Sequence, residues 1–281
     1  VFCFDLDGVE LWQKRLDPVK IRYDWGTAAS PVLHEDKLFI VNDNDDGSYL
    51  LVLDAKTGKE LFKIDRDEKS NWATPYIWKN EQRTELVTCG SNKVRSYDLN
   101  GTLLWELGPM STITIPTPIE MNGLLYVCSG FVGDRDKQPI YAIRPGASGD
   151  ISPVDWQPND YVVWTHQFGA PYNPSPIAYD GYFYVLHDRG HISCYDGASG
   201  TVIYEKQQLA KDAKAFTASP WANDGKLFFL SEDGDTFVVQ AGPDFKVLER
   251  NPLDEMCLVT PATLRGNLVI RTLTKLYRIG K

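Results

Sequence analysis

The sequence has few of the residues that catalytic and metal sites usually require. It contains only four histidines, dispersed along the chain, and no Gly-x-Ser-x-Gly nucleophile elbow. One local group, His187-Asp188-Arg189, has the residue types for acid–base work, but a turn at the start of a strand explains it better. The five cysteines match no zinc-binding spacing, and we interpret them as buried structural thiols: Cys3, Cys89, Cys128, Cys194 and Cys257.

Long apolar runs, basic stripes and sustained helical periodicity are also missing. No stretch of 18 apolar residues occurs, so we predict no membrane-spanning segment. The net charge of -9, with no concentrated Lys/Arg face, argues against nucleic-acid binding. Apolar spacing typical of helices never continues beyond about two turns. Because 43% of the residues are hydrophobic, a sizeable core is still expected, and an all-β chain is the class that remains.

A hairpin pattern recurs through the chain. Residues 50–62 read "LLVLDAKTGKELF", and similar stretches occupy 1–12, 94–105 and 192–204. In each, an apolar strand ends in Asp, a turn containing Gly follows, and a second apolar strand can end in an aromatic residue. The Asp is expected to accept amide hydrogens from the turn, and the aromatic to pack between units. The structural residues predicted in this way are Asp5, Trp12, Asp54, Gly58, Asp98, Trp105, Asp196 and Gly200.

A second repeated marker, Ser or Thr followed by Pro, precedes each hairpin. The markers are separated by 44, 43, 58, 44 and 41 residues, counted from the Ser or Thr. Each interval has room for four short strands, and units of about 40–45 residues with four strands are typical of β-propeller blades. The long interval predicts an insertion at about 129–166. The marker residues are Ser30, Thr74, Thr117, Ser175, Ser219 and Thr260.

The stretch "LDAKTGKELF" resembles the pyrroloquinoline-quinone (PQQ) repeat family, whose propeller blades carry an Ala-x-Asp-x-x-Thr-Gly-x-x-x-Trp docking motif. The resemblance is clear at 50–62 and 192–204 and implies one β-propeller over residues 1–281. The C-terminal unit supplies three strands of a blade and the N-terminus two. We therefore expect a ring of seven or eight blades whose first blade or blades lie outside this sequence.

In propellers of this family, the loops between blades (D–A loops) and those between the second and third strands of a blade (B–C loops) share one face. That geometry selects a mixed set of aromatic, polar and charged residues of the kind that binding surfaces use. An alternative is that they only cover the blade junctions. The binding candidates are Trp25, Asn71, Trp72, Tyr172, Asn173, Asp188, Arg189, Phe216, Glu232, Asp233 and Arg271.

The resemblance also bears on whether the protein binds a cofactor. Similar enzymes bind PQQ beneath a vicinal cysteine pair, over a stacked Trp, with Ca²⁺ held by Asp, Glu and Asn. This sequence has no adjacent cysteines, although Trp25 or Trp72 has the residue type for stacking. The acidic stretch "DNDDG" is a weak match to a Ca²⁺ loop, with Asp43 and Asp45 as the metal-ligand candidates.

The resemblance leaves two functions open. The first is a non-catalytic scaffold, like the PQQ-like propellers that bind no cofactor, including the lipoprotein that assists assembly of outer-membrane β-barrels. The second is a PQQ- and Ca²⁺-dependent oxidoreductase. The absent cysteine pair favours the scaffold, and the expected partner is an envelope protein or another ligand of unknown identity. The family also suggests a bacterial protein of the periplasm or cell envelope.

Overall fold

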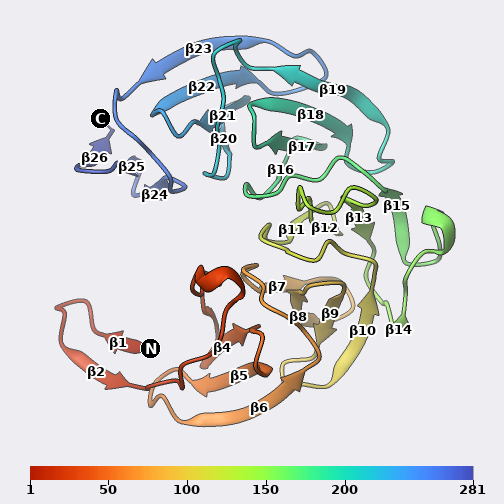
Figure 1. The fold of residues 1–281 in the computed structure, drawn as a ribbon, viewed down its shortest axis with the longest axis vertical. Coiled ribbons are helices and arrows are strands. Elements are labelled where there is room, and N and C mark those ends of the chain that lie inside the picture. The colour runs from red at the N-terminus through yellow and green to blue at the C-terminus, as the bar shows by residue number, and fades with distance from the viewer. Residues whose placement is uncertain (281) are drawn as a thin grey trace.

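The computed structural model describes residues 1–280 as strands joined by turns and loops, with two short 3-10 helices. The predicted β-propeller is confirmed: the strands form consecutive, mostly four-stranded antiparallel sheets arranged around a centre (Figure 1). The chain begins with a two-stranded sheet, β1 (Phe2–Phe4) and β2 (Glu10–Gln13), and ends with a three-stranded one, β24 (Ala262–Leu264), β25 (Asn267–Arg271) and β26 (Leu276–Ile279).

Five complete blades lie between these two sheets, and each runs from an inner strand outward in chain order. The first two consist of β3 (Val32–His34), β4 (Lys37–Asn42), β5 (Ser48–Asp54), β6 (Glu60–Arg66), and of β7 (Tyr76–Lys79), β8 (Thr84–Cys89), β9 (Val94–Tyr97), β10 (Leu103–Leu107). The third has β11 (Ile119–Met121), β12 (Leu124–Cys128), β13 (Ile140–Ile143) and β15 (Val162–His166). The last two are β16 (Ile177–Tyr179), β17 (Tyr182–His187), β18 (His191–Asp196), β19 (Val202–Gln208), and β20 (Trp221–Asn223), β21 (Lys226–Leu230), β22 (Asp235–Gln240), β23 (Val247–Pro252).

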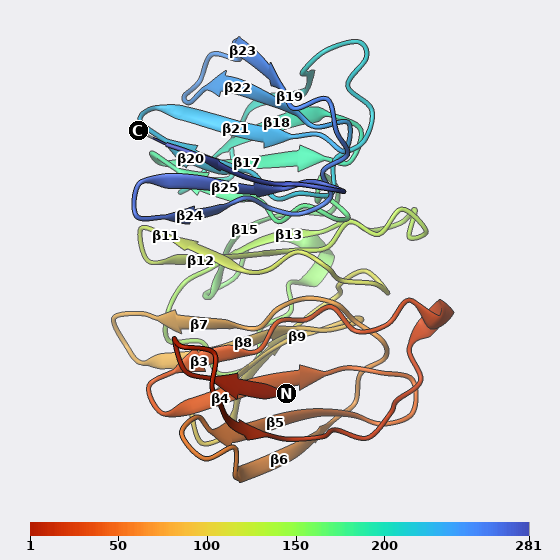
Figure 2. The ribbon, with the colours of Figure 1, turned by 90° about the vertical axis from the view of Figure 1, so that its left-hand side faces the viewer.

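The ring is open in Figure 1, with β1 and β2 on one side of the opening and β24–β26 on the other. The six inner strands follow the six Ser/Thr-Pro markers, in agreement with the repeat seen in the sequence. Figure 2 shows the molecule from the side, with the segment that carries the 3-10 helix η1 (Arg22–Asp24) projecting from one face.

The repeated Asp organises the turn after the third strand of a blade. Asp54 accepts hydrogen bonds from the backbone N–H and the hydroxyl of Thr57, at 2.8 and 2.7 Å. Asp196 binds Ser199 in the same way, at 2.8 and 2.7 Å. These hydrogen bonds lower the pKa of both carboxyl groups and keep them ionised as acceptors. The recurrence of Asp therefore has a local structural cause.

An aromatic side chain in the outer strand of one blade packs on the turn glycine of the next. The Trp12 indole N–H donates to the Ala55 carbonyl oxygen at 3.0 Å, and its ring covers Gly58, where a Cβ atom would lie 2.6 Å from the ring. Trp164 makes the equivalent contact, donating to the Gly197 carbonyl oxygen at 2.8 Å and covering Gly200. Glycine is required at both turns because φ is positive and no room exists for a side chain.

Trp105 departs from this pattern. Its indole N–H donates to Glu85 Oε2, within its own blade, at 2.7 Å, although Trp105 still belongs to a buried cluster that includes Tyr141 and Ile143 of the next blade. Trp164, in contrast, makes the blade-to-blade contact although the hairpin pattern does not predict it. The 58-residue interval displaces it from its expected place in the repeat, which is why the pattern does not identify it.

The Ser/Thr-Pro markers have a structural role that the sequence does not indicate. The backbone N–H of one marker residue donates to the hydroxyl oxygen of the next, so neighbouring blades are linked just before their inner strands. Within residues 1–280, the pair Thr74 and Thr117 lacks this link. The bonded pairs are Ser30–Thr74 (3.0 Å), Thr117–Ser175 (3.0 Å), Ser175–Ser219 (2.9 Å) and Ser219–Thr260 (2.9 Å).

The insertion reinforces the junction that lacks this link. The connection between β13 and β15 contains β14 (Gly149–Asp150), which adds to β10 of the preceding blade as a parallel fifth strand, and the 3-10 helix η2 (Val154–Trp156). Close by, Arg83 donates to the Ala147 carbonyl oxygen at 2.5 Å. The inserted residues therefore fasten the second complete blade to the third.

The aromatic–glycine contact predicts different outcomes for the same substitution at two turns. Gly200 and Gly225 have almost equal φ values, +71° and +68°, but only Gly200 is covered, by Trp164. We expect Gly225→Ala to cost about 1 kcal/mol of unfolding free energy, from backbone strain alone. Gly200→Ala should cost about 1–3 kcal/mol more, because the added methyl displaces the indole. Urea denaturation of both variants tests this, and equal losses would contradict the docking role of Trp164.

Candidate functional site

Beside the D–A and B–C loops of the first blades lies the segment that leads from β2 to β3. This segment is held by two neighbours: the Arg22 backbone N–H donates to Ser70 Oγ at 2.9 Å, and the Lys20 backbone N–H donates to Asp46 at 2.7 Å. Tyr23 has a positive φ of 57° within η1. The backbone is thus bent and anchored at the same place, which turns the residues around η1 toward solvent.

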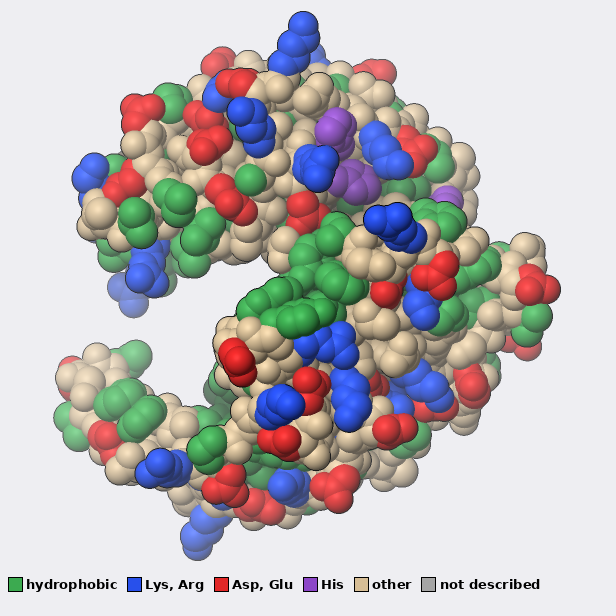
Figure 3. All heavy atoms as spheres, in the orientation of Figure 1, with side chains coloured by type: hydrophobic (Ala, Val, Ile, Leu, Met, Phe, Trp, Pro, Cys, Tyr) green, Lys and Arg blue, Asp and Glu red, His purple; other side chains and the backbone are tan. Residues whose placement is uncertain are grey.

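Aromatic residues from three D–A loops and the insertion meet on this face. Trp25 lies 5.0 Å from Tyr23 and 5.5 Å from Trp72, measured between ring centroids. The Phe131 and Tyr172 rings are tilted relative to each other with centroids 5.3 Å apart, and both pack against the buried cluster that contains Trp72. Tyr23 and Trp25 are 66% and 56% exposed, so their rings are available for contact. Figure 3 shows hydrophobic side chains gathered at the middle of this face, beside the opening of the ring.

The exposed rings of Tyr23 and Trp25 form the aromatic surface. Asn71 and Trp72, two of the predicted binding residues, are buried next to it. Trp72 donates its indole N–H to the Gly26 carbonyl oxygen at 2.8 Å, and Asn71 Oδ1 accepts from the Thr114 backbone N–H at 3.0 Å. The Asn71 Nδ2 is buried and has no hydrogen-bond partner among the described residues. Both residues therefore support the loops through these hydrogen bonds.

Asp188 connects the two other predicted residues of this region, Tyr172 and Asn173. Its carboxylate accepts the backbone N–H of both, at 3.0 Å each, and the Asn173 side-chain amide at 2.7 Å. Arg189 follows it in the turn between β17 and β18 and is exposed. Phe216 is only 1% exposed and packs beneath Gly190 of the same turn, so it supports the turn and is not a surface contact.

The acidic loop 43–47 binds protein groups. Both oxygens of the buried Asp43 accept from the Arg66 guanidinium, at 2.8 and 3.1 Å. Burial lowers the pKa of Arg66, but the charge and hydrogen bonds of Asp43, together with Tyr97 and Glu68, raise it overall. Asp45 accepts from the Ser70 hydroxyl at 2.8 Å. These contacts count against the predicted Ca²⁺ ligands, because the bidentate Arg66 already neutralises Asp43. Within residues 1–280, no group of three or more His, Cys, Asp or Glu side chains is arranged to hold a metal ion.

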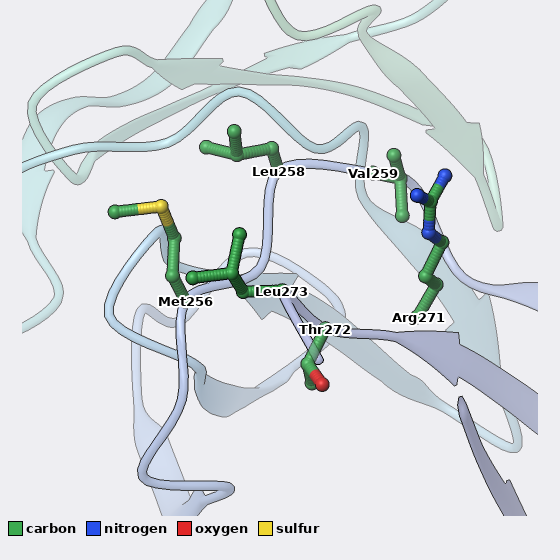
Figure 4. A pocket seen from close by; sticks show the side chains of 6 residues that line it. All are labelled: Met256, Leu258, Val259, Arg271, Thr272 and Leu273. Atoms are coloured by element: carbon green, nitrogen blue, oxygen red, sulfur yellow. The ribbon is translucent and has the colours of Figure 1, made fainter. Parts of the chain in front are cut away.

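Arg271, Glu232 and Asp233 lie in the last two sheets, apart from the aromatic surface. Glu232 accepts from the Thr217 hydroxyl at 2.5 Å, and Asp233 is exposed. Arg271 borders a hollow of about 180 Å³ (Figure 4). Figure 4 shows Arg271 beside Val259, and Met256 beside Leu273, with Leu258 above them. The predicted site residues therefore fall into separate groups, and the structure does not bring them into one site.

The four buried thiols offer little reactivity. All five cysteines are free, and every one except the half-buried Cys3 is buried. Burial raises the pKa of Cys89 and of Cys194 to about 12, and it also raises the pKa of Cys128 and Cys257. The thiolate is the reactive form of cysteine, so these groups are poor nucleophiles at neutral pH.

Sequence reasoning missed Tyr23, Phe131 and Lys206 as surface residues. Tyr23 is two positions from Trp25, in a loop that was selected, and its exposure depends on the bend at η1. Phe131 lies in the insertion, where no repeat position marks it. Lys206 lies within β19, and nothing in its sequence surroundings distinguishes it from other exposed lysines.

Residues 1–129 match the PQQ-like repeat model described as outer membrane protein assembly factor BamB. BamB from Moraxella catarrhalis has 13% identity and a TM-score of 0.49, with 92% of this chain and 97% of that chain covered. The quinohemoprotein alcohol dehydrogenase ADHIIG from Pseudomonas putida HK5 has 13% identity and a TM-score of 0.57, and covers 84% of this chain. This chain spans 43% of that enzyme's length. A search of curated protein sequences found no match to this chain.

The consecutive four-stranded sheets and the aromatic contacts between them define a β-propeller protein. The match over residues 1–129 confirms, for that part of the chain, the resemblance to PQQ-like repeats seen in the hairpin motif. At 13% identity, the similarity to the dehydrogenase concerns the fold alone. No helix among residues 1–280 is long and apolar enough to cross a membrane.

The lowered pKa of His187 predicts that the protein loses stability in acid. Burial, followed by the nearby Lys206 charge, lowers the pKa of His187 to about 4. A depressed pKa means that the unfolded chain binds the proton more tightly, so stability is present above about pH 6.5 and falls as the pH drops toward 4. We expect the wild type to lose about 3 kcal/mol more than His187→Gln between pH 7 and pH 4.

Chemical denaturation at several pH values measures this difference. The same substitution at His34, in another blade, controls for the change of residue type. Because carboxyl groups titrate equally in the wild type and both variants, only the difference between their pH profiles is informative. Parallel profiles for the wild type and His187→Gln would contradict the assignment of a neutral, buried His187.

Proposed function

We propose that this protein is a non-catalytic scaffold that binds a protein partner through the aromatic surface of its loop face. The observation that carries the proposal is the exposure of Tyr23 and Trp25 on a strained, anchored segment. Trp and Tyr are the residues most often responsible for binding energy at protein interfaces. Here they project from loops that rigid blades hold in place, a common arrangement for recognition.

The family match supports a role in the cell envelope. The model that matches residues 1–129 describes an outer membrane protein assembly factor, so we propose a periplasmic or envelope location in a bacterium, with an envelope protein as partner. The partner chemistry that fits Tyr23 and Trp25 is an extended segment with apolar side chains. Such a segment gains affinity by burying the two rings, and loops with one conformation limit the entropy lost on binding.

The aromatic surface can be tested with an unfolded protein as the probe. Reduced, carboxymethylated α-lactalbumin provides extended apolar segments, and fluorescence anisotropy measures its binding. We expect the double variant Tyr23→Ser/Trp25→Ser to weaken binding at least tenfold, because each hot-spot aromatic contributes on the order of 1–2 kcal/mol. Val154→Ser, which removes a 77% exposed apolar residue from the insertion, is the matched control. Equal binding by the double variant and this control would rule out the proposed surface.

Thermal unfolding with PQQ and Ca²⁺ distinguishes a second candidate function, PQQ-dependent oxidation, from the scaffold function. Trp25 is the one predicted stacking residue with an exposed ring, since Trp72 is buried. A cofactor present at a hundredfold excess over its dissociation constant would add about 2.7 kcal/mol. For a chain of this size, that raises the midpoint by a few degrees. The scaffold proposal predicts no rise, whereas a rise that needs both additives and disappears in Trp25→Ser would replace it with the oxidoreductase.

A further inference from the structure

A cavity of about 370 Å³ lies beside the turn between β17 and β18, and neither Tyr23 nor Trp25 lines it. Its apolar part comes from the loop after β12 and from the D–A loop that follows β15. Gly130 is needed there because a side chain at this position would collide with the backbone of Ala170 and Pro171. Its charged part comes from β17–β19. The residues used in the following argument are Val132, Ala170, Arg189, His191 and Lys206.

Few carboxylates form ion pairs with the basic side chains around this cavity. Within residues 1–280, neither Arg189 nor His191 forms an ion pair, and Lys206 has only Glu205, at 3.7 Å with both side chains more than half exposed. Such exposed pairs contribute little. Asp188 also lines the cavity, but its oxygens accept three hydrogen bonds from residues 172–173. Two basic side chains, Arg189 and Lys206, therefore line the cavity beside one carboxylate whose oxygens already accept hydrogen bonds.

The positive charge continues into a neighbouring hollow of about 350 Å³. Arg189 and His191 line both spaces, and Lys214 is added in the second. Figure 3 shows His side chains next to Lys and Arg side chains on this part of the face. A concave surface with several cations and apolar walls attracts anions, and it favours those that carry an apolar group.

Lys206 is held in an unfavourable backbone conformation. Its φ is 48°, and it is the only residue other than glycine with a positive φ inside a strand of residues 1–280. The register between β18 and β19 shifts twice, whereas the outer strands of the other four complete blades show one shift each. The additional bulge directs the Lys206 N–H to Ser193 Oγ at 3.1 Å. Bulges and strained residues that redirect a side chain are concentrated at functional sites.

We propose that this cavity binds an organic carboxylate with a small apolar body. The Arg189 guanidinium presents paired N–H donors that match a carboxylate, while Lys206 adds charge and His191 a ring nitrogen for hydrogen bonding. Val132 and Ala170 contact the apolar body. The cavity is at the small end of the range for ligand sites, about 300–1,000 Å³, which suits a single short acid or one terminal residue of a chain. This site uses residues other than the aromatic surface and does not depend on the scaffold proposal.

The test compares 4-methylpentanoate with its uncharged amide by isothermal titration calorimetry on the full chain. We expect the acid to bind and the amide to bind at least tenfold more weakly. Arg189→Gln should weaken the acid about tenfold, the usual effect of losing a charge-assisted hydrogen bond. Lys206→Gly should weaken it similarly while keeping or raising the thermal midpoint, since glycine accepts a positive φ without strain.

Lys59→Gln, which removes one exposed positive charge from another blade, is the matched control and should bind like the wild type. Two sources of the carboxylate are separated with tetrapeptides that end in Leu, one with a free and one with an amidated C-terminus. Tighter binding of the free peptide than of 4-methylpentanoate identifies a chain terminus, and equal or weaker binding identifies a free acid. The proposal is overturned if no acid binds at about 10 mM, if inorganic phosphate binds more tightly than the acids, or if Arg189→Gln and Lys206→Gly bind like Lys59→Gln.

Discussion

The contact between an outer-strand aromatic ring and the turn glycine of the next blade is the interaction on which the rest of the structure depends. Trp12 on Gly58 and Trp164 on Gly200 each combine an indole hydrogen bond with a ring placed where no side chain fits. An aromatic ring buries a large apolar area, and its hydrogen bond fixes the direction of approach. The orientation of neighbouring blades is therefore determined at their outer edges, while the marker hydroxyls link their inner strands.

Rigid junctions allow the loops to adopt conformations that would be unfavourable alone. The positive φ at Tyr23 and Lys206 is tolerated because the surrounding contacts, at Ser70 and Ser193, hold the backbone on either side. Buried polar groups contribute to the same support. The Arg66–Asp43 pair is fully buried, and Arg66 also donates to Thr88 and Tyr97 of the next blade at 2.8 and 3.0 Å. Removing one partner would leave a buried charge unpaired, so this network holds the acidic loop in one place.

The predictions from sequence succeeded where the cause is local or repeated. The all-β class, the six inner strands after the Ser/Thr-Pro markers and the resemblance to PQQ-like repeats are confirmed. The ligand-binding candidates depend instead on burial, which the repeat does not specify. Trp25 and Phe216 occupy similar loops, yet the first is 56% and the second 1% exposed. The acidic loop illustrates the same limit, because the partner of Asp43 is 23 residues away in sequence.

The sequence by itself determined the hairpins, the turn residues and the repeat, because these follow from side-chain alternation, from the side-chain acceptor of Asp and from the freedom of glycine within a few residues. Only the tertiary structure decided which loop residues are exposed and where cations collect. Those properties arise from contacts between distant segments, such as Arg22 with Thr112, 90 residues apart, or Gly130 with Ala170. Each blade specifies its own strands, whereas the surface of the ring is set by how neighbouring blades and their loops pack together.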